Sequence, residues 1–254
     1  MKKIISPLMF AMSLAVAGSA LAQTAPAAPA STLSFNVGAT SDYRYRGISQ
    51  SRLDPAFSGG ADYADKSGAY IGVWGSSIKW IKDNLGKSNT EVDIYGGYKF
   101  AVGDLAYDVG FLRYEYSGNK LEVNPAYVNA NTNELYGAVT AGPATLKYSR
   151  STGNLFGTPN SKGSYYLDLT ATFDMGDGFS LTPHVGYQNV KGAGNSIYTY
   201  TDYALTLGKD LGGGLSASAG VIGTDAKKDA YISPFAPGKQ LGKAGLVVGI
   251  KYTF

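Results

Sequence analysis

The segment Ala244-Gly-Leu-Val-Val-Gly-Ile-Lys-Tyr-Thr-Phe254 decides the fold. Every second residue from Ala244 to Phe254 is apolar or aromatic, and the residues between them are smaller and more polar. A repeat of two residues predicts a β-strand with two different faces. A strand of about ten residues with one wholly apolar face is typical of a strand that crosses a lipid bilayer. The segment therefore predicts a transmembrane β-barrel.

The first residues predict a secretory signal peptide. Lys2 and Lys3 precede an apolar stretch at 4–16, and Ala20-Leu-Ala22 has the small residues of a cleavage site. The apolar stretch is too short for a membrane-spanning helix. We therefore expect residues 1–22 to be removed, and residues 23–32, which are rich in Ala and Pro, to form a periplasmic leader without a core. Residues 33–254 would then form one outer-membrane β-barrel domain.

The composition narrows the class of protein further. The chain has no cysteine, so a secreted form needs a source of stability other than disulfides, and closing a barrel supplies one. Two of its 22 basic residues lie in the predicted signal peptide, which leaves the mature chain nearly neutral. The balance of charge therefore does not favour nucleic acid as a partner.

The same alternation recurs along the chain about every twenty residues. We expect an all-β protein, an antiparallel up-and-down transmembrane barrel of about twelve strands, with ten or fourteen as alternatives because strand ends are hard to place from sequence. The connections alternate between short and longer, as expected for periplasmic turns and outer loops. The expected strands cover 33–46, 55–64, 69–77, 91–100, 105 onward, 133–141, 144–151, 164–173, 179–188, 200–208, 215–224 and 244–254.

Alternation also assigns charged side chains to the lumen. Lys or Arg facing lipid at the bilayer midplane would cost about 2–4 kcal/mol. Arg113 and Glu115 fall on the outward parity, so either they lie above the hydrocarbon or a bulge turns them inward. The segment 69–77 has no charge on either face, which leaves its orientation open. The predicted pore-lining residues are Asp42, Arg44, Arg46, Asp62, Glu91, Asp93, Lys99, Asp108, Glu134, Lys147, Asp168, His184 and Asp202, with Lys251 of the last strand facing the same way.

Nothing in the sequence predicts a chemical step. His184 is the only histidine, and it has neither a cysteine nor a second histidine as a partner. Catalytic triads and metal centres need more such groups. We therefore expect no catalytic residues, no metal site and no cofactor, and we interpret His184 as an ordinary polar residue of the lumen.

Several segments resemble one family. The stretch Ser41-Asp-Tyr-Arg-Tyr-Arg-Gly-Ile-Ser-Gln-Ser51 resembles the N-terminal signature of the TorF family of porins, and softer similarities follow at 70–76, 93–98, 107–111 and 133–136. The resemblance covers roughly residues 33–254. It implies a barrel in the outer membrane of proteobacteria that acts as a channel, and it implies no particular solute.

The first motif also suggests a constriction. On one extended strand, Asp42, Arg44 and Arg46 would share the lumen face near the outer mouth, Tyr43 and Tyr45 would anchor the opposite face in the membrane interface, and Gly47 would begin the first outer loop. We expect Arg44 and Arg46 to pair across the lumen with acids such as Asp62 or Asp93.

The sequence therefore predicts a porin-like channel in the bacterial outer membrane, for passive diffusion of small polar solutes or ions. Lumen acids outnumber bases, which favours cations. The alternative is a non-conducting structural or surface-interaction barrel. Expected partners are outer-membrane lipid and lipopolysaccharide, and the barrel-assembly machinery, for which Tyr252 and Phe254 of the last strand would be the signal.

Overall fold

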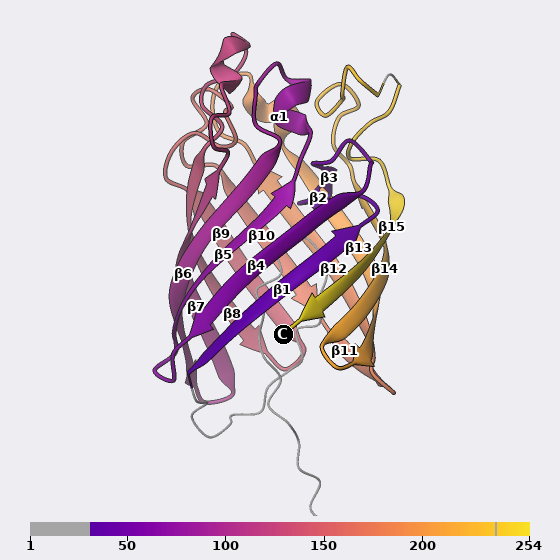
Figure 1. Cartoon of the computed structure of the whole chain (residues 1–254). Helices are drawn as coiled ribbons and strands as arrows, with labels where there is room; N and C mark the ends of the chain where they lie inside the picture. Colours follow the sequence, from indigo (N-terminus) through magenta and orange to yellow (C-terminus); the bar gives the residue numbers. More distant parts are fainter. Residues whose placement is uncertain (1–30, 237) are drawn as a thin grey trace, which may run out of the picture.

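The computed structural model describes residues 31–236 and 238–254 and forms a closed antiparallel barrel of twelve strands (Figure 1). Each strand pairs with the next along the chain, and β15 pairs with β1 to close the ring. The ring contains β1 (Thr32–Thr40), β4 (Ala56–Ala64), β5 (Ala69–Ser77), β6 (Thr90–Val102), β7 (Leu105–Glu115), β8 (Thr132–Ala141), β9 (Ala144–Ser151), β10 (Tyr165–Ala171), β12 (Phe179–Asn189), β13 (Tyr200–Gly212), β14 (Leu215–Thr224) and β15 (Gly245–Thr253).

Smaller elements complete the chain. Strand β11 (Phe173–Gly176) continues β10 along β12, and β2 (Arg44–Tyr45) and β3 (Ile48–Ser49) form a separate two-stranded sheet. The helical segments are α1 (Trp80–Asp83), η1 (Leu121–Val123) and η2 (Asn195–Tyr198). No helix in the described residues is long and apolar enough to cross a membrane. The predicted signal peptide and most of the predicted leader lie outside the described residues.

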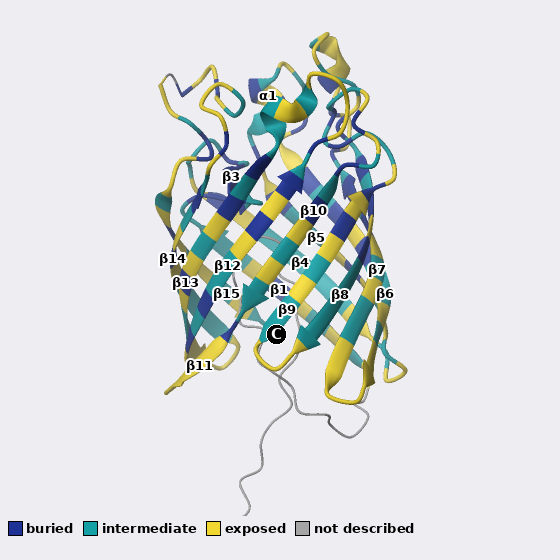
Figure 2. Cartoon of the chain, turned by 180° about the vertical axis from the view of Figure 1, so that it is seen from behind, coloured by how far each residue is buried: buried dark blue, intermediate teal, exposed yellow. Residues whose placement is uncertain are grey.

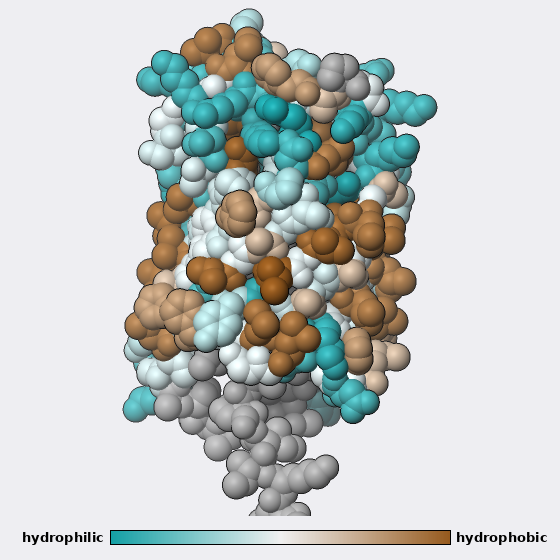
Figure 3. Space-filling model, turned by 45° about the vertical axis from the view of Figure 1, so that its right-hand side comes forward, coloured by the Kyte–Doolittle hydropathy of each residue, from teal (hydrophilic) through white to brown (hydrophobic). Residues whose placement is uncertain are grey.

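The predicted two-faced strands are confirmed. Exposed residues alternate with less exposed ones along most of the wall strands (Figure 2), and the exposed ones are mainly apolar. On β15, for example, Leu246, Val248 and Ile250 point outward, and Val247 between them is buried. The outer wall thus presents an apolar belt with hydrophilic side chains above it (Figure 3), which suits a barrel surrounded by lipid.

Two open questions of orientation are settled. On β5, Ile71 and Val73 point outward, whereas Ser76 is buried on the inner face. Strand β7 pairs with β6 without a shift of register, so no bulge turns Arg113 and Glu115 inward. They lie on the outer face at the end of β7 that leads into a long loop, and Nε of Arg113 donates a hydrogen bond to Glu115 at 2.9 Å.

The two ends of the barrel differ as the connection lengths predict. Two- to four-residue turns at 65–68, 103–104, 142–143, 177–178 and 213–214 close one end. The connections at 41–55, 78–89, 116–131, 152–164, 190–199 and 225–244 gather at the other end, which carries α1 (Figure 1). These outer loops contact one another, for example where Nζ of Lys79 donates a hydrogen bond to Asp54. This hydrogen bond lowers the pKa of the Asp54 carboxyl.

The predicted first strand is too long. Strand β1 ends at Thr40 rather than at residue 46, and the chain then leaves the wall. Residues 42–51 fold back on themselves through the β2–β3 pairing. The sequence alternates through this segment as well, because a short hairpin has the same period of two as a wall strand.

The C-terminal residue closes the seam of the barrel. Backbone amides and carbonyls of Phe35 and Phe254 exchange hydrogen bonds at 2.8 and 3.0 Å, and their rings stack with centroids 5.8 Å apart. Phe254 also stacks on Tyr252 at 5.5 Å. A role of Tyr252 and Phe254 as an assembly signal stays a prediction, but their part in closing the ring is structural.

Deleting Phe254 should therefore weaken closure. The deletion removes two backbone hydrogen bonds and two aromatic contacts, together worth about 2 kcal/mol or more. We expect a smaller fraction of the compact, heat-modifiable band after refolding in detergent and a lower unfolding temperature. Phe254→Tyr keeps the ring and the backbone bonds and should behave as wild type. Equal unfolding temperatures for the deletion and for wild type would contradict this account.

Candidate functional site in the barrel lumen

A hairpin formed by residues 42–51, here called the lumen hairpin, lies inside the barrel. Asp42 organises its base, because its carboxylate accepts hydrogen bonds from Arg44 Nε at 2.7 Å, Ser49 Oγ at 2.5 Å and Ser51 Oγ at 3.3 Å. Asp42 and Arg44 are both buried. A buried carboxylate with these hydrogen bonds stabilises the hairpin conformation of residues 42–51 relative to an extended strand that would continue along the wall.

The tip of the lumen hairpin is a two-residue turn. Arg46 and Gly47 both have positive φ, +47° and +77°, as a type I′ turn requires. A Cβ atom on Gly47 would lie 2.5 Å from Cγ2 of Thr224 and 2.7 Å from Cβ of Asp202. The tip is therefore wedged against β13 and β14, and glycine is needed there for both backbone conformation and space.

Arg46 ties this tip to the far side of the ring. Its Nη2 donates to both carboxylate oxygens of Glu134 on β8 at 2.7 and 3.0 Å, and its Nη1 donates to Gln188 on β12 at 2.7 Å. The guanidinium also lies 4.3 Å from the ring centroid of Tyr166 on β10. Because β8 to β12 lie opposite β1 in the ring, the lumen hairpin crosses the lumen.

The predicted roles of the first motif need correction. Arg46 pairs with Glu134, and Arg44 pairs with Asp42, rather than either pairing with Asp62 or Asp93. Tyr43 is only 2% exposed, and its hydroxyl donates to Glu91, so it does not anchor the membrane interface. The Tyr45 hydroxyl likewise contacts that of Tyr114 inside the barrel.

Acidic side chains gather beside the lumen hairpin. Glu91 accepts hydrogen bonds from Tyr43 and from Tyr116, the latter at 2.7 Å. Asp93, two residues further along β6, is fully buried, and neither of its carboxylate oxygens has a hydrogen-bond partner in the described residues. With Glu134 matched by Arg46, the wall here holds more acidic than basic side chains.

His184 lies between two carboxylates. Its Nε2 is 2.8 Å from Asp202, its Nδ1 is 3.6 Å from Asp168, and Nδ1 also lies 2.9 Å from the Thr170 hydroxyl. Tyr166 donates to both oxygens of Asp202 at 2.9 and 3.0 Å. Sequence reasoning placed these groups on the inner face and missed their convergence. In residues 31–236 and 238–254, no group of three or more His, Cys, Asp or Glu could hold a metal ion.

A second layer of charges lies nearer the short turns. Lys99 is opposite Asp108 across the β6–β7 pair, and Lys147 is opposite Asp168 across the β9–β10 pair. Tyrosines that point inward also belong to this layer. The alternation of the strands is consistent with their inward position, but they carry no charge and so are absent from the predicted pore-lining residues. Tyr95 donates to Asp62 at 2.5 Å, Tyr70 donates to Asp108 at 2.6 Å, and Nζ of Lys147 lies 4.0 Å from the Tyr136 ring centroid.

Asp93 and Asp202 offer a matched test of this arrangement, because both are buried carboxylates on wall strands. Asp93→Asn should raise the unfolding temperature, since it replaces a buried carboxyl that has no hydrogen-bond partner with a group that cannot ionise. Asp202→Asn should lower the free energy of unfolding by about 1.5–3 kcal/mol, because it breaks charge-assisted bonds to Tyr166 and His184. Thermal unfolding of both refolded variants checks this prediction. Equal shifts of the unfolding temperature would show that the difference in hydrogen bonding between Asp93 and Asp202 does not affect stability.

Solved structures share this fold. The KdgM porin aligns with a TM-score of 0.53 and 9% identity, over 87% of this chain and 99% of its own. The NanC porin aligns with a TM-score of 0.53 and 10% identity, over 88% and 99%. KdgM in complex with disordered oligogalacturonate gives 0.54 and 9%, over 88% and 99%. At such low identity the likeness shows the fold, that of outer-membrane porins.

The sequence comparisons are less specific about function. No curated protein matches the sequence. A family description matches residues 23–254, the whole chain after the predicted signal peptide, and it does not carry the TorF name, so that resemblance stays a prediction. The chain belongs to the family described as bacterial protein of unknown function (Gcw_chp).

Proposed function

We propose that this protein is an outer-membrane channel that admits small polar solutes or ions by passive diffusion. The observation that carries the proposal is the chemistry of the inner wall, where hydroxyls and charged side chains line the lumen from the lumen hairpin down to the short turns. Thr140 bonds Thr145, and Thr172 bonds Thr182, below the charged layer. If the lumen were a water-free core, apolar side chains at these positions would make the barrel more stable.

The lumen hairpin sets the narrowest part of the proposed path. It occupies the lumen at the level of Glu91, Glu134 and Gln188, and solutes would pass beside it. Its guanidinium groups are matched by Asp42 and Glu134, whereas Glu91 and Asp93 form no ion pair with a basic side chain of the described residues. Charged groups at a constriction select ions by sign. We therefore propose a preference for cations.

The fold neighbours support a channel without supplying its solute. KdgM was solved with oligogalacturonate, which is a polyanion. The excess of acids around the lumen hairpin opposes a polyanionic solute in the present chain, because like charges at low dielectric repel. The resemblance to TorF porins points to a channel too, and it likewise names no solute.

Planar-bilayer recording tests the proposal directly. The refolded barrel should give discrete conductance steps, and a tenfold KCl gradient should give a reversal potential of the sign set by cation flow. The physical reason is the uncompensated carboxylates beside the lumen hairpin. Absence of steps from a heat-modifiable, folded barrel would reject the channel, and a reversal potential of the opposite sign would reject the cation preference.

Arg46→Ala tests the constriction. The substitution breaks a buried ion pair, a loss of about 3–5 kcal/mol, and should free the tip of the lumen hairpin from β8 and β12. We expect larger conductance steps and a stronger cation preference, because Glu134 is then unmatched. Arg113→Ala is the control, since Arg113 is also paired with a glutamate but lies on the outer face. The constriction is wrong if Arg46→Ala changes neither conductance nor thermal stability.

A further inference from the structure

The barrel wall has a gap on its outer half, at the seam where β1 leaves it. Strand β1 pairs with β15 from Asn36 to Thr40, and backbone hydrogen bonds of Phe35 with Phe254 and of Ser41 with Val248 extend this contact by one residue at each end. Beyond this point, Gly245 and Leu246 pair with β14 on one side and have no β1 residue on the other. The departure of the lumen hairpin into the barrel thus leaves an unpaired length of β15 edge.

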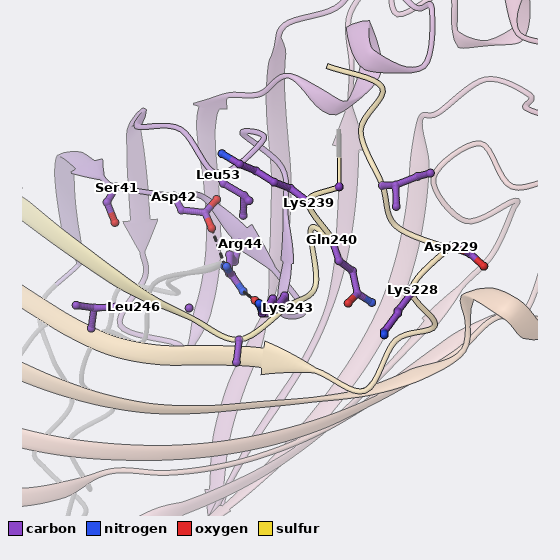
Figure 4. A pocket seen from close by; sticks show the side chains of 14 residues that line it. Ser41, Asp42, Arg44, Leu53, Lys228, Asp229, Lys239, Gln240, Lys243 and Leu246 are labelled. Carbon is purple, nitrogen blue, oxygen red and sulfur yellow. Dashed lines mark hydrogen bonds and ion pairs between the residues drawn. The ribbon is translucent and has the colours of Figure 1, made fainter. Parts of the chain in front are cut away.

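A groove of about 880 Å³ occupies this gap (Figure 4). Its inner wall is formed by Asp42 and Arg44 at the base of the lumen hairpin, and its upper rim by the connection 225–244. Ser41 and Leu246 line its lower side, and Leu246 is 69% exposed at the top of the apolar belt of β15. The groove therefore lies where the apolar wall meets the polar loops, at the depth of lipid headgroups.

The charges around the groove are mostly positive. Lys228, Lys239 and Lys243 line it from the connection 225–244, and Asp229 is the one acid that this connection contributes to the lining. None of the three lysines takes part in an ion pair within the described chain. Exposed lysines that form no ion pair beside a groove offer sites for an anion brought by another molecule.

Arg44 provides a buried cation at the back of the groove. Its Nη1 donates to the carbonyls of Ile222 at 2.9 Å and Lys243 at 2.8 Å, and its Nε donates to Asp42. Its Nη2 has no acceptor among residues 31–236 and 238–254, and it would lie 3.0 Å from a Cβ on Gly245. The guanidinium is thus held rigidly with one amine directed past a glycine at the groove.

We propose that this seam groove binds the phosphorylated headgroup of an outer-leaflet lipid, with its acyl chains on the apolar face of β15. Lys228, Lys239 and Lys243 contact the phosphate, and Arg44 faces it from the back. Below the charged residues, Leu246 and Val248 extend the site with apolar surface. Acyl chains can be buried on this surface, whereas a soluble phosphate has no apolar part to bury there. The combination of cations above and apolar side chains below fits an amphiphile. This proposal is independent of conduction through the lumen.

Titration of diphosphoryl lipid A into the refolded barrel in neutral detergent tests the site, with binding read from native mass spectrometry and from the unfolding temperature. The variant Lys228→Gln/Lys239→Gln/Lys243→Gln should weaken binding at least tenfold. The control Lys82→Gln/Lys87→Gln/Lys162→Gln makes the same change of charge on exposed lysines of other outer loops and should change binding less than twofold.

The remaining arms separate this site from its rivals. Dephosphorylated lipid A should bind wild type as weakly as diphosphoryl lipid A binds the groove variant. Equal losses in the groove and control variants would overturn the proposal in favour of general charge attraction. Inorganic pyrophosphate is the last competitor to test. If it binds as tightly as the lipid and depends equally on the groove lysines, the proposal that a lipid occupies the groove is wrong. Both triple variants must show the heat-modifiable band, since exposed loop lysines are not needed for folding.

Discussion

The structure depends on the requirement that backbone hydrogen-bonding groups be satisfied where no water is available. In hydrocarbon an unpaired amide or carbonyl costs several kcal/mol, so a sheet that crosses the membrane must close on itself. Here closure is made by β1 and β15, and it extends to the last residue through Phe254 and Phe35. The antiparallel neighbours, the short turns and the apolar belt all follow from that ring.

The lumen hairpin brings polar backbone groups and buried charged side chains into the ring. Most of these groups find hydrogen-bond or ion-pair partners close by. Asp42 accepts hydrogen bonds at the base, Arg46 and Glu134 pair at the tip, and tyrosine hydroxyls donate to wall acids such as Glu91. Buried ion pairs add little net stability compared with apolar packing, but they are costly to break and they specify one arrangement. The hairpin is therefore best understood as a device that fixes the shape and the charge of the lumen.

The departure of the chain into the lumen after β1 also has a consequence on the outside of the barrel. The same turn at residue 41 that starts the lumen hairpin leaves β15 without a neighbour above Val248, so the constriction and the seam groove have one cause. Arg44 belongs to both, because it hydrogen-bonds Asp42 within the hairpin and the carbonyls of Ile222 and Lys243 at the seam. A substitution at Arg44 would therefore disturb the lumen and the outer surface together.

The sequence by itself determined the strands, their faces and the ends to which turns and loops belong. A period of two with one apolar face is a local property, and lipid on one side and water on the other impose it on each strand separately, as on β15. It also assigned His184, Glu134 and Asp202 to the inside. Only the tertiary structure decided that the chain leaves the wall at Ser41, because a hairpin alternates just as a wall strand does. It alone decided that Arg46 meets Glu134, 88 residues away, since partners across a lumen are set by how the ring closes and how the hairpin lies within it.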